Sequence, residues 1–157
     1  MRKNDFTMKP ATQEVLSPDE VYFFYYDVMR SDLEDFPFDW NEKIEAFLKG
    51  KGIVAEVKKG VKLPDTCEKN ILYLSVGSKD KGNKGVAFIR HLRNAFTHFH
   101  IIHNGEYLNI KDIRGKDITM IGQIKFEDLK ELCYLFFDQK KEFGNKFYSE
   151  GTSLDRI

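Results

Sequence analysis

Residues 88–103, FIRHLRNAFTHFHIIH, constrain this chain more than any other stretch, because they combine helical periodicity with clustered chemistry. Apolar residues recur there at spacings of three, four and three: Ile89, Leu92, Phe96 and Phe99. This pattern predicts a helix over about 85–100 with one core-facing seam. The same stretch holds all four histidines of the protein. We therefore expect one buried helix face and one chemically active face.

The remaining periodicity also predicts mostly helices. Ser17, Pro18 and Glu20 form a capping-box pattern that begins a helix running to about Leu33. Its expected core face is Val21, Phe24, Tyr25 and Val28, and its second apolar side is Tyr22, Phe23 and Tyr26. Three further helices are predicted: one capped by Asp39 and stopped by Gly50, one from about Pro64 through CEKNILYLSV, and one over about 126–143.

Strand signals are sparser than helix signals. EYLNIKDI and DITMIGQI flank Arg114-Gly115-Lys116, which predicts a β-hairpin with a three-residue loop. IVAEV, in residues 53–57, is interpreted as part of a connection. SKDKGNKG, residues 78–85, lacks a Walker-type ending and is interpreted as a flexible linker, not a phosphate loop. The pattern as a whole indicates a mainly α fold of four to five helices with one hairpin before the last helix.

Length and composition predict one soluble domain. The 157 residues suffice for a single core, with residues 1–13 and 145–157 expected to be flexible. No apolar run is long enough for a transmembrane helix and no secretory signal is visible, so we expect a cytoplasmic protein without a membrane partner. Cys67 and Cys133 form no motif and are expected to be free thiols.

Charge is unevenly distributed although the net charge is zero. Residues 14–49 carry ten acids against three bases, whereas residues 51–93 carry ten bases against four acids. This basic middle can present a positive patch to phosphate, although solvated charged faces would give the same counts.

A helical wheel places His91, Asn94 and His98 opposite the apolar seam, on an expected solvent face. A His-rich polar surface without function is one interpretation. A metal site is disfavoured because no Cys or carboxylate lies at ligand spacing, so no metal or other cofactor is expected. The third interpretation is phosphodiester chemistry, because histidine suits proton transfer near neutrality and arginine binds phosphate through two N–H groups.

Arg93-Asn94-x-x-x-His98, on a helix that opens with Phe88-Ile89-Arg90-His91-Leu92, resembles the motif of the HEPN superfamily. The longer string HLRNAFTH, followed by a hairpin and a terminal helix, is similar to a plasmid- and bacterial-genome-associated HEPN group of the toxin or defence type. The resemblance covers about residues 17–140 and is strongest over 86–137.

The resemblance implies an up-and-down helical bundle that dimerises through the motif helix. It implies a metal-independent endoribonuclease that cleaves RNA by attack of the 2′-hydroxyl, acting as a toxin or antiviral effector, with an antitoxin protein as a further partner. Arg93 would stabilise the scissile phosphate, Asn94 would orient the site, and His98 would be the general acid or base. The alternative is a non-catalytic HEPN module that binds RNA, a nucleotide or a protein.

The wheel adds three expectations. Arg90, His91 and Thr97 are proposed as RNA contacts from their positions alone. Arg93 and His98 lie about 140° apart around a regular helix, so one straight helix does not bring both to one phosphate. Either the arginine reaches round the helix, or the site is shared across a two-fold dimer in which the aromatic first helix is buried; we favour the dimer. His100 and His103 are expected to have surface or capping roles.

Overall fold

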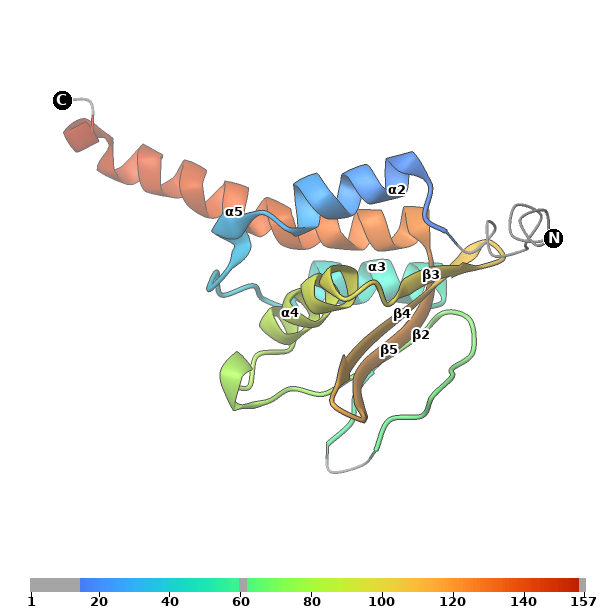
Figure 1. Ribbon diagram of the computed structural model, residues 1–157. Coiled ribbons are helices and arrows are strands. Elements are labelled where there is room, and N and C mark those ends of the chain that lie inside the picture. The colour runs from blue at the N-terminus through green and yellow to red at the C-terminus, as the bar shows by residue number, and fades with distance from the viewer. Residues whose placement is uncertain (1–14, 60–61, 156–157) are drawn as a thin grey trace.

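The computed structural model describes residues 15–59 and 62–155, in which helices pack on a five-stranded sheet (Figure 1). The predicted N-terminal arm, residues 1–13, lies outside the described residues. The helical elements are α2 (Pro18–Tyr22), the π-helix η2 (Phe23–Val28), the 3-10 turns η3 (Ser31–Leu33) and η4 (Ser78–Asp80), α3 (Glu42–Lys51), α4 (Lys84–Thr97) and α5 (Phe126–Asp155).

The sheet has the strand order β1-β2-β5-β4-β3. Its strands are β1 (Val54–Val57), β2 (Ile71–Leu74), β3 (Ile101–Asn104), β4 (Tyr107–Arg114) and β5 (Asp117–Lys125). β1 and β2 are parallel, and the other neighbours are antiparallel. Consecutive antiparallel strands need only short turns, whereas the parallel pair requires the long connection between β1 and β2.

The predicted fold class is wrong. The chain is not a mainly α up-and-down bundle with one hairpin, because its helices pack on a mixed sheet of five strands. ILYL was predicted as helix but forms β2, with Leu72 and Leu74 buried on alternate positions. IVAEV was interpreted as a connection but contains β1. Short apolar runs of this kind do not distinguish strand from helix by periodicity.

The predicted β-hairpin is confirmed as β4 and β5, although its loop is shorter than expected. Arg114 pairs with Asp117, so Gly115 and Lys116 alone form the turn, with Gly115 at φ +67°. A register shift between Asp112 and Ile113 leaves Thr119 of β5 without an opposite residue on β4. Such a bulge redirects a side chain, and here it bears on the functional site.

The first helix follows its predicted cap, but its predicted core face is confirmed only at Phe24 and Val28. Ser17 and Glu20 exchange both capping-box hydrogen bonds, at 3.2 and 2.7 Å. The helix then widens into η2, which changes the angle between successive residues. Phe23, Phe24 and Val28 are buried, whereas the predicted core residues Val21 and Tyr25 are exposed.

The second predicted helix forms with shifted ends. Asn41, not Asp39, caps α3 by accepting from the Ile44 N–H at 3.0 Å. The helix passes Gly50 and ends at Lys51, and the residue that caps it, Gly52, has a φ of +73° that suits glycine. The last helix was predicted to end near residue 143, but α5 continues to Asp155.

One hydrophobic core joins the helices to one face of the sheet. Leu72, Leu74, Leu108, Ile110, Met120 and Ile124 from the sheet share a buried cluster with Phe24, Phe88, Leu92, Leu132 and Phe136 from the helices. In Figure 1 the long helix α5 runs between α2 and α3, and α4 lies in front of α3 and beside the sheet. The core therefore fixes α4 between the sheet and the other helices.

No helix among residues 15–59 and 62–155 is long and apolar enough to cross a membrane. Cys67 and Cys133 are free cysteines, as predicted, and Cys133 is fully buried in the apolar stripe of α5.

Candidate functional site

Helix α4, which carries the Arg93-Asn94-x-x-x-His98 motif, is held at both ends. Asn83 caps its start by accepting from the Gly85 and Val86 N–H groups at 2.8 and 3.1 Å. At its end the His100 N–H donates to the Ala95 carbonyl at 2.8 Å, which closes the last turn.

The residue that terminates α4 is not the expected core residue. Phe99 has φ +61° and its side chain is 86% exposed, so its predicted place in the apolar seam is wrong. The left-handed conformation reverses the chain before β3 begins and is costly for a residue with a Cβ. As a result His98 lies at the exposed C-terminus of the helix, beside an exposed aromatic ring.

The predicted solvent position of His91 is also wrong. Its side chain is 1% exposed, because the sheet that the sequence interpretation missed covers that side of α4. Asn94 is half-buried and His98 is exposed. The open strip of α4 is therefore narrower than predicted, and it follows Arg90, Arg93, Asn94, Thr97 and His98.

A buried polar pair connects α4 to the sheet. His91 Nδ1 lies 2.6 Å from Asp112 Oδ2 on β4, and His91 Nε2 lies 2.8 Å from the Ser75 carbonyl oxygen. The Asp112 carboxylate and the Ser75 carbonyl oxygen are both acceptors. Because a neutral imidazole has a single N–H, both contacts are hydrogen bonds at the same time only when each ring nitrogen carries a proton. Burial opposes ionisation of Asp112, but hydrogen bonds from His91, Asn94 and Thr119 hold the pKa of this carboxyl below its ordinary value.

The same carboxylate orients the motif asparagine. Asn94 Nδ2 lies 3.4 Å from Asp112 Oδ2. An ionised carboxylate accepts hydrogen bonds and cannot donate them, so the amide nitrogen of Asn94 must face Asp112 and the amide oxygen must face away. Thr119, at the β-bulge, donates to the Asp112 backbone carbonyl at 3.0 Å. The sheet thus sets which end of the Asn94 amide is presented.

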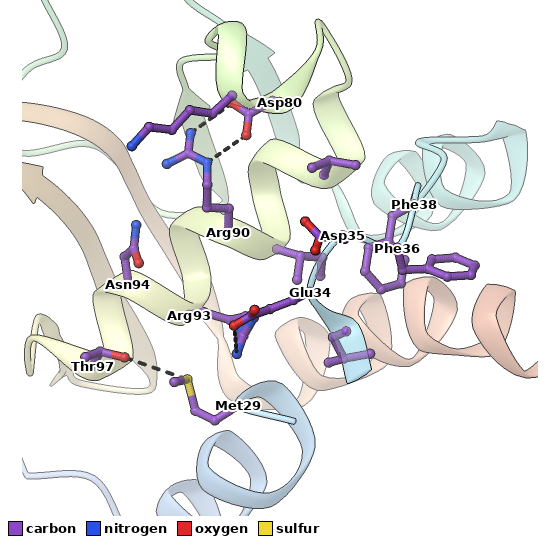
Figure 2. Close-up of a pocket in the computed structure, with 14 residues that line it drawn as sticks. Met29, Glu34, Asp35, Phe36, Phe38, Asp80, Arg90, Arg93, Asn94 and Thr97 are labelled. Atoms are coloured by element: carbon purple, nitrogen blue, oxygen red, sulfur yellow. Dashed lines mark hydrogen bonds and ion pairs between the residues drawn. The ribbon is translucent and has the colours of Figure 1, made fainter. Parts of the chain in front are cut away.

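A second carboxylate fixes Arg90. Asp80, which is fully buried, accepts two hydrogen bonds from the Arg90 guanidinium at 2.7 and 2.8 Å and one from the Gly77 N–H at 2.9 Å (Figure 2). Burial disfavours the charge of Asp80, yet the guanidinium and the N–H hold its pKa below the ordinary value. This pair fastens η4 to α4, and it engages a residue that the wheel proposed as an RNA contact.

Arg93 leaves α4 on a different side from Asn94 (Figure 2). Its guanidinium lies 3.5 Å from Glu34 Oε1, and its Nε is buried without a hydrogen-bond partner among the described residues. Thr97, one turn further on, donates to the Met29 sulfur at 3.8 Å. The motif arginine therefore faces the segment that joins η2 to α3.

Two hollows of about 430 Å³ each flank the open strip of α4. The first, here called the Arg93 hollow, lies against the Met29–Phe38 segment and includes Arg93 and Thr97. The second, here called the His98 hollow, lies against the β4–β5 hairpin and includes His91 and His98. Lys79, Arg90 and Asn94 line both. Within one chain, Asn94 shares one hollow with Arg93 and the other with His98. Arg93 and His98 do not line the same hollow.

Asp112, Asp80 and Glu34 were not identified from the sequence. The sequence contained a signal for Asp112. Leu108, Ile110 and Asp112 occupy alternate positions of one strand, and the side chains of Leu108 and Ile110 face the core. A carboxylate in such a position requires a buried partner. Asp80 ends the single turn η4 and Glu34 follows the single turn η3, and segments this short have no periodicity that marks a side chain as facing a site.

The two remaining histidines have different surroundings. His103 Nε2 lies 2.7 Å from Glu20 Oε1, so it joins β3 to the capping box of α2. His100 Nδ1 is buried without a hydrogen-bond partner among the described residues.

Comparison with known families places this site in a wider group. The model of the family HEPN pEK499 p136 matches residues 27–146, which is more than half of the chain. The chain belongs to this HEPN family. The matched range contains α4, both hollows and the β4–β5 hairpin, so the predicted membership of the HEPN superfamily is confirmed. Searches of curated proteins and of solved structures found no match.

Proposed function

We propose that this HEPN domain is a metal-independent endoribonuclease that cleaves RNA by attack of its own 2′-hydroxyl. One observation carries the proposal: Arg93, Asn94 and His98 all lie on the open strip of α4, and each lines at least one of the two hollows beside it. Membership of a HEPN family supports a nuclease or nucleotide-related module. The residue types supply what the reaction requires, namely a phosphate-binding cation and a group that transfers protons near neutrality.

The three motif residues divide the reaction between them. A base takes the proton of the 2′-hydroxyl, and the resulting oxygen attacks phosphorus to form a new P–O bond. The bond from phosphorus to the 5′-oxygen then breaks, and an acid protonates that oxygen. His98, exposed at the end of α4, performs one of these proton transfers. Arg93 stabilises charge on the phosphorane, and Asn94 orients the reacting groups.

The reaction centre is shared between two copies of the chain. A two-fold axis beside the open strip of α4 would bring Arg93 of one copy towards His98 of the other, which a single chain keeps in separate hollows. Phe99, which follows His98, and the exposed tyrosines of α2 and η2 supply apolar surface for the interface: Tyr22, Tyr25 and Tyr26. This arrangement resolves the 140° separation that a regular helix imposes.

The three RNA contacts proposed from the wheel receive different roles. Thr97 is exposed and stays a substrate contact. Arg90 faces both hollows and meets the substrate with the part of its guanidinium that Asp80 leaves open. His91, whose ring nitrogens both face protein oxygens, supports Asn94 through Asp112.

Cleavage of a fluorescent RNA oligonucleotide in EDTA tests the proposal. Wild-type protein is expected to cleave, and His98→Ala is expected to lose about 10²–10⁴-fold in rate, the usual contribution of general acid–base catalysis. The products should end in a 2′,3′-cyclic phosphate. His103→Ala is the matched control, because it removes an imidazole on β3 outside both hollows. No cleavage by the wild type, or equal cleavage by His98→Ala, contradicts the catalytic claim.

The second candidate is a non-catalytic HEPN module that binds RNA, a nucleotide or a protein partner. The separation of Arg93 from His98 within one chain favours it if the protein is monomeric. Binding of RNA without turnover, lost in Arg93→Ala, would support this class. A role as a toxin or antiviral effector, with or without an antitoxin protein, stays a prediction.

A further inference from the structure

Two cationic side chains, Lys79 and Arg114, line the His98 hollow. Lys79 enters it from η4 and Arg114 from the end of β4, and both side chains are exposed. Neither takes part in an ion pair within the part of the chain that the structure describes. Arg90 differs, because Asp80 binds it, and the one carboxylate in the lining, Asp112, is occupied by His91. The hollow therefore offers uncompensated positive charge on two walls.

We infer that the His98 hollow binds single-stranded RNA, with Lys79 and Arg114 each holding a phosphate next to the one at which His98 acts. The inference rests on the proposed ribonuclease function and names the substrate form that its site accepts. α4 forms one wall of the hollow, and η4 and the β4–β5 hairpin form the others. A strand lying along α4 passes between Lys79 and Arg114, because these residues stand on elements that flank the helix.

The size of the hollow selects a single strand. Its volume of about 430 Å³ is near the lower end of the range for small-molecule sites, enough for about one nucleotide. Bases in an A-form duplex are stacked and paired, and the deep major groove hides them from side chains. An unpaired nucleotide can turn its sugar and phosphate towards the hollow, which the 2′-hydroxyl reaction also requires.

The orientation of Asn94 selects RNA over DNA. Its amide nitrogen faces Asp112 at 3.4 Å, so its oxygen is left as a hydrogen-bond acceptor. A 2′-hydroxyl can donate to this acceptor, whereas a deoxyribose has nothing to donate there. Asp112 and His91 hold this orientation from the buried side of the helix.

The lining also predicts how affinity depends on salt. No Phe, Tyr or Trp lines this hollow among the described residues, so stacking of bases on those rings does not contribute there. Binding then depends on phosphate contacts, whose strength falls as salt rises because bound counterions are released. On single strands each contact contributes a slope of about 0.7 in log affinity against log salt.

Fluorescence anisotropy with a labelled ten-nucleotide RNA of mixed sequence tests the inference. All variants are made in full-length His98→Ala protein, so that binding is measured without turnover. Adding Lys79→Ala and Arg114→Ala is expected to weaken binding at least tenfold and to lower the salt slope by about 1.4, the value for two lost contacts. The matched control adds Lys43→Ala and Lys49→Ala, which remove the same charge from exposed positions of α3. The control should bind within twofold of the parent.

Equal weakening in both double variants would overturn the inference, because net charge alone would then explain the loss. An unchanged affinity in the Lys79→Ala, Arg114→Ala protein would overturn it as well. DNA of the same sequence and duplex RNA are expected to bind at least severalfold more weakly; equal binding of either overturns the assignment to single-stranded RNA. Cleavage by wild-type protein is measured in parallel. RNA that binds in the hollow but is never cleaved contradicts the ribonuclease proposal and leaves this inference standing.

Discussion

The two hollows beside α4 have the same volume but differ in the charge and polarity of their linings. The Arg93 hollow is lined by three carboxylates and three Lys or Arg side chains, with Leu33, Phe36 and Phe38 among its apolar walls. The His98 hollow is lined by three Lys or Arg side chains and one carboxylate. One helix therefore presents a charge-balanced, partly apolar side and a basic, polar side. The motif places its arginine on the first side and its histidine on the second.

Within one chain, Arg93 and His98 therefore line different hollows. In the Arg93 hollow, the Arg93 guanidinium lies 3.5 Å from the Glu34 carboxylate. The His98 hollow holds an exposed histidine and uncompensated cations but no Arg93. Asn94 lines both hollows.

The largest change is expected in the RNA cleavage rate, when a substitution in the Arg93 hollow and one in the His98 hollow are combined in one dimer. Arg93→Ala and His98→Ala should each lose at least about 10²-fold in cleavage rate, because one removes charge stabilisation and the other proton transfer. A heterodimer with one variant in each chain contains one intact shared site and one doubly defective site. Its rate should recover to about half of the wild type. Co-expression with two affinity tags and purification on both isolates the heterodimer for the RNA cleavage assay.

The control is the doubly substituted homodimer, which carries both changes in each chain and should stay inactive. Inactive heterodimers that fold and bind RNA would show that each chain completes its own site, with Arg93 reaching round α4. Light scattering that finds a monomer at micromolar concentration would contradict the dimer directly.

The second effect concerns stability, and it contrasts one carboxylate from each hollow. Asp112→Ala leaves the buried His91 without its partner and is expected to cost about 3 kcal/mol in the free energy of unfolding. Glu34→Ala removes an ion pair whose carboxylate is 61% exposed, and it should cost less than about 1 kcal/mol. Urea unfolding of both variants and the wild type measures the difference. Equal costs would show that the His91–Asp112 pair does not anchor α4 to the sheet.

These contrasts also show what the sequence could and could not predict. The motif helix, its family, the β4–β5 hairpin and the capping box were predictable, because each depends on residues close together in the chain. The sheet was not, because β1 and β2 are short runs whose partners lie far away in sequence. The missing sheet explains the error at His91: a helical wheel identifies the face opposite a seam but not what covers that face. For the same reason Asp112 was overlooked.

The third prediction concerns how the free energy of unfolding depends on pH through Asp112, the carboxylate of the His98 hollow. The pKa of Asp112 is lower in the folded protein than the value of about 3.9 for an unfolded chain. Its contribution is therefore fully present above about pH 4 and is lost as the pH falls through the folded-state pKa. The difference in unfolding free energy between wild type and Asp112→Ala should be largest at pH 7 and should shrink towards pH 3. Urea unfolding at both pH values measures it, and a constant difference would contradict an ionised Asp112.

The smallest effect is expected at Glu34 and concerns RNA binding. Glu34 lies 3.5 Å from the Arg93 guanidinium, in the place that a substrate phosphate would take, so the two anions compete for one cation. Glu34→Gln removes the competing charge and keeps the shape of the side chain. RNA affinity should rise about two- to fivefold, because a surface ion pair of this kind is worth less than about 1 kcal/mol. Anisotropy in the His98→Ala background measures the change. Glu106→Gln, an equal charge change in the β3–β4 turn, is the control, because a similar gain there would mean that net charge alone raises affinity. A gain confined to Glu34→Gln would mean that the Arg93 hollow is held closed to phosphate by its own carboxylate, whereas the His98 hollow is open to it.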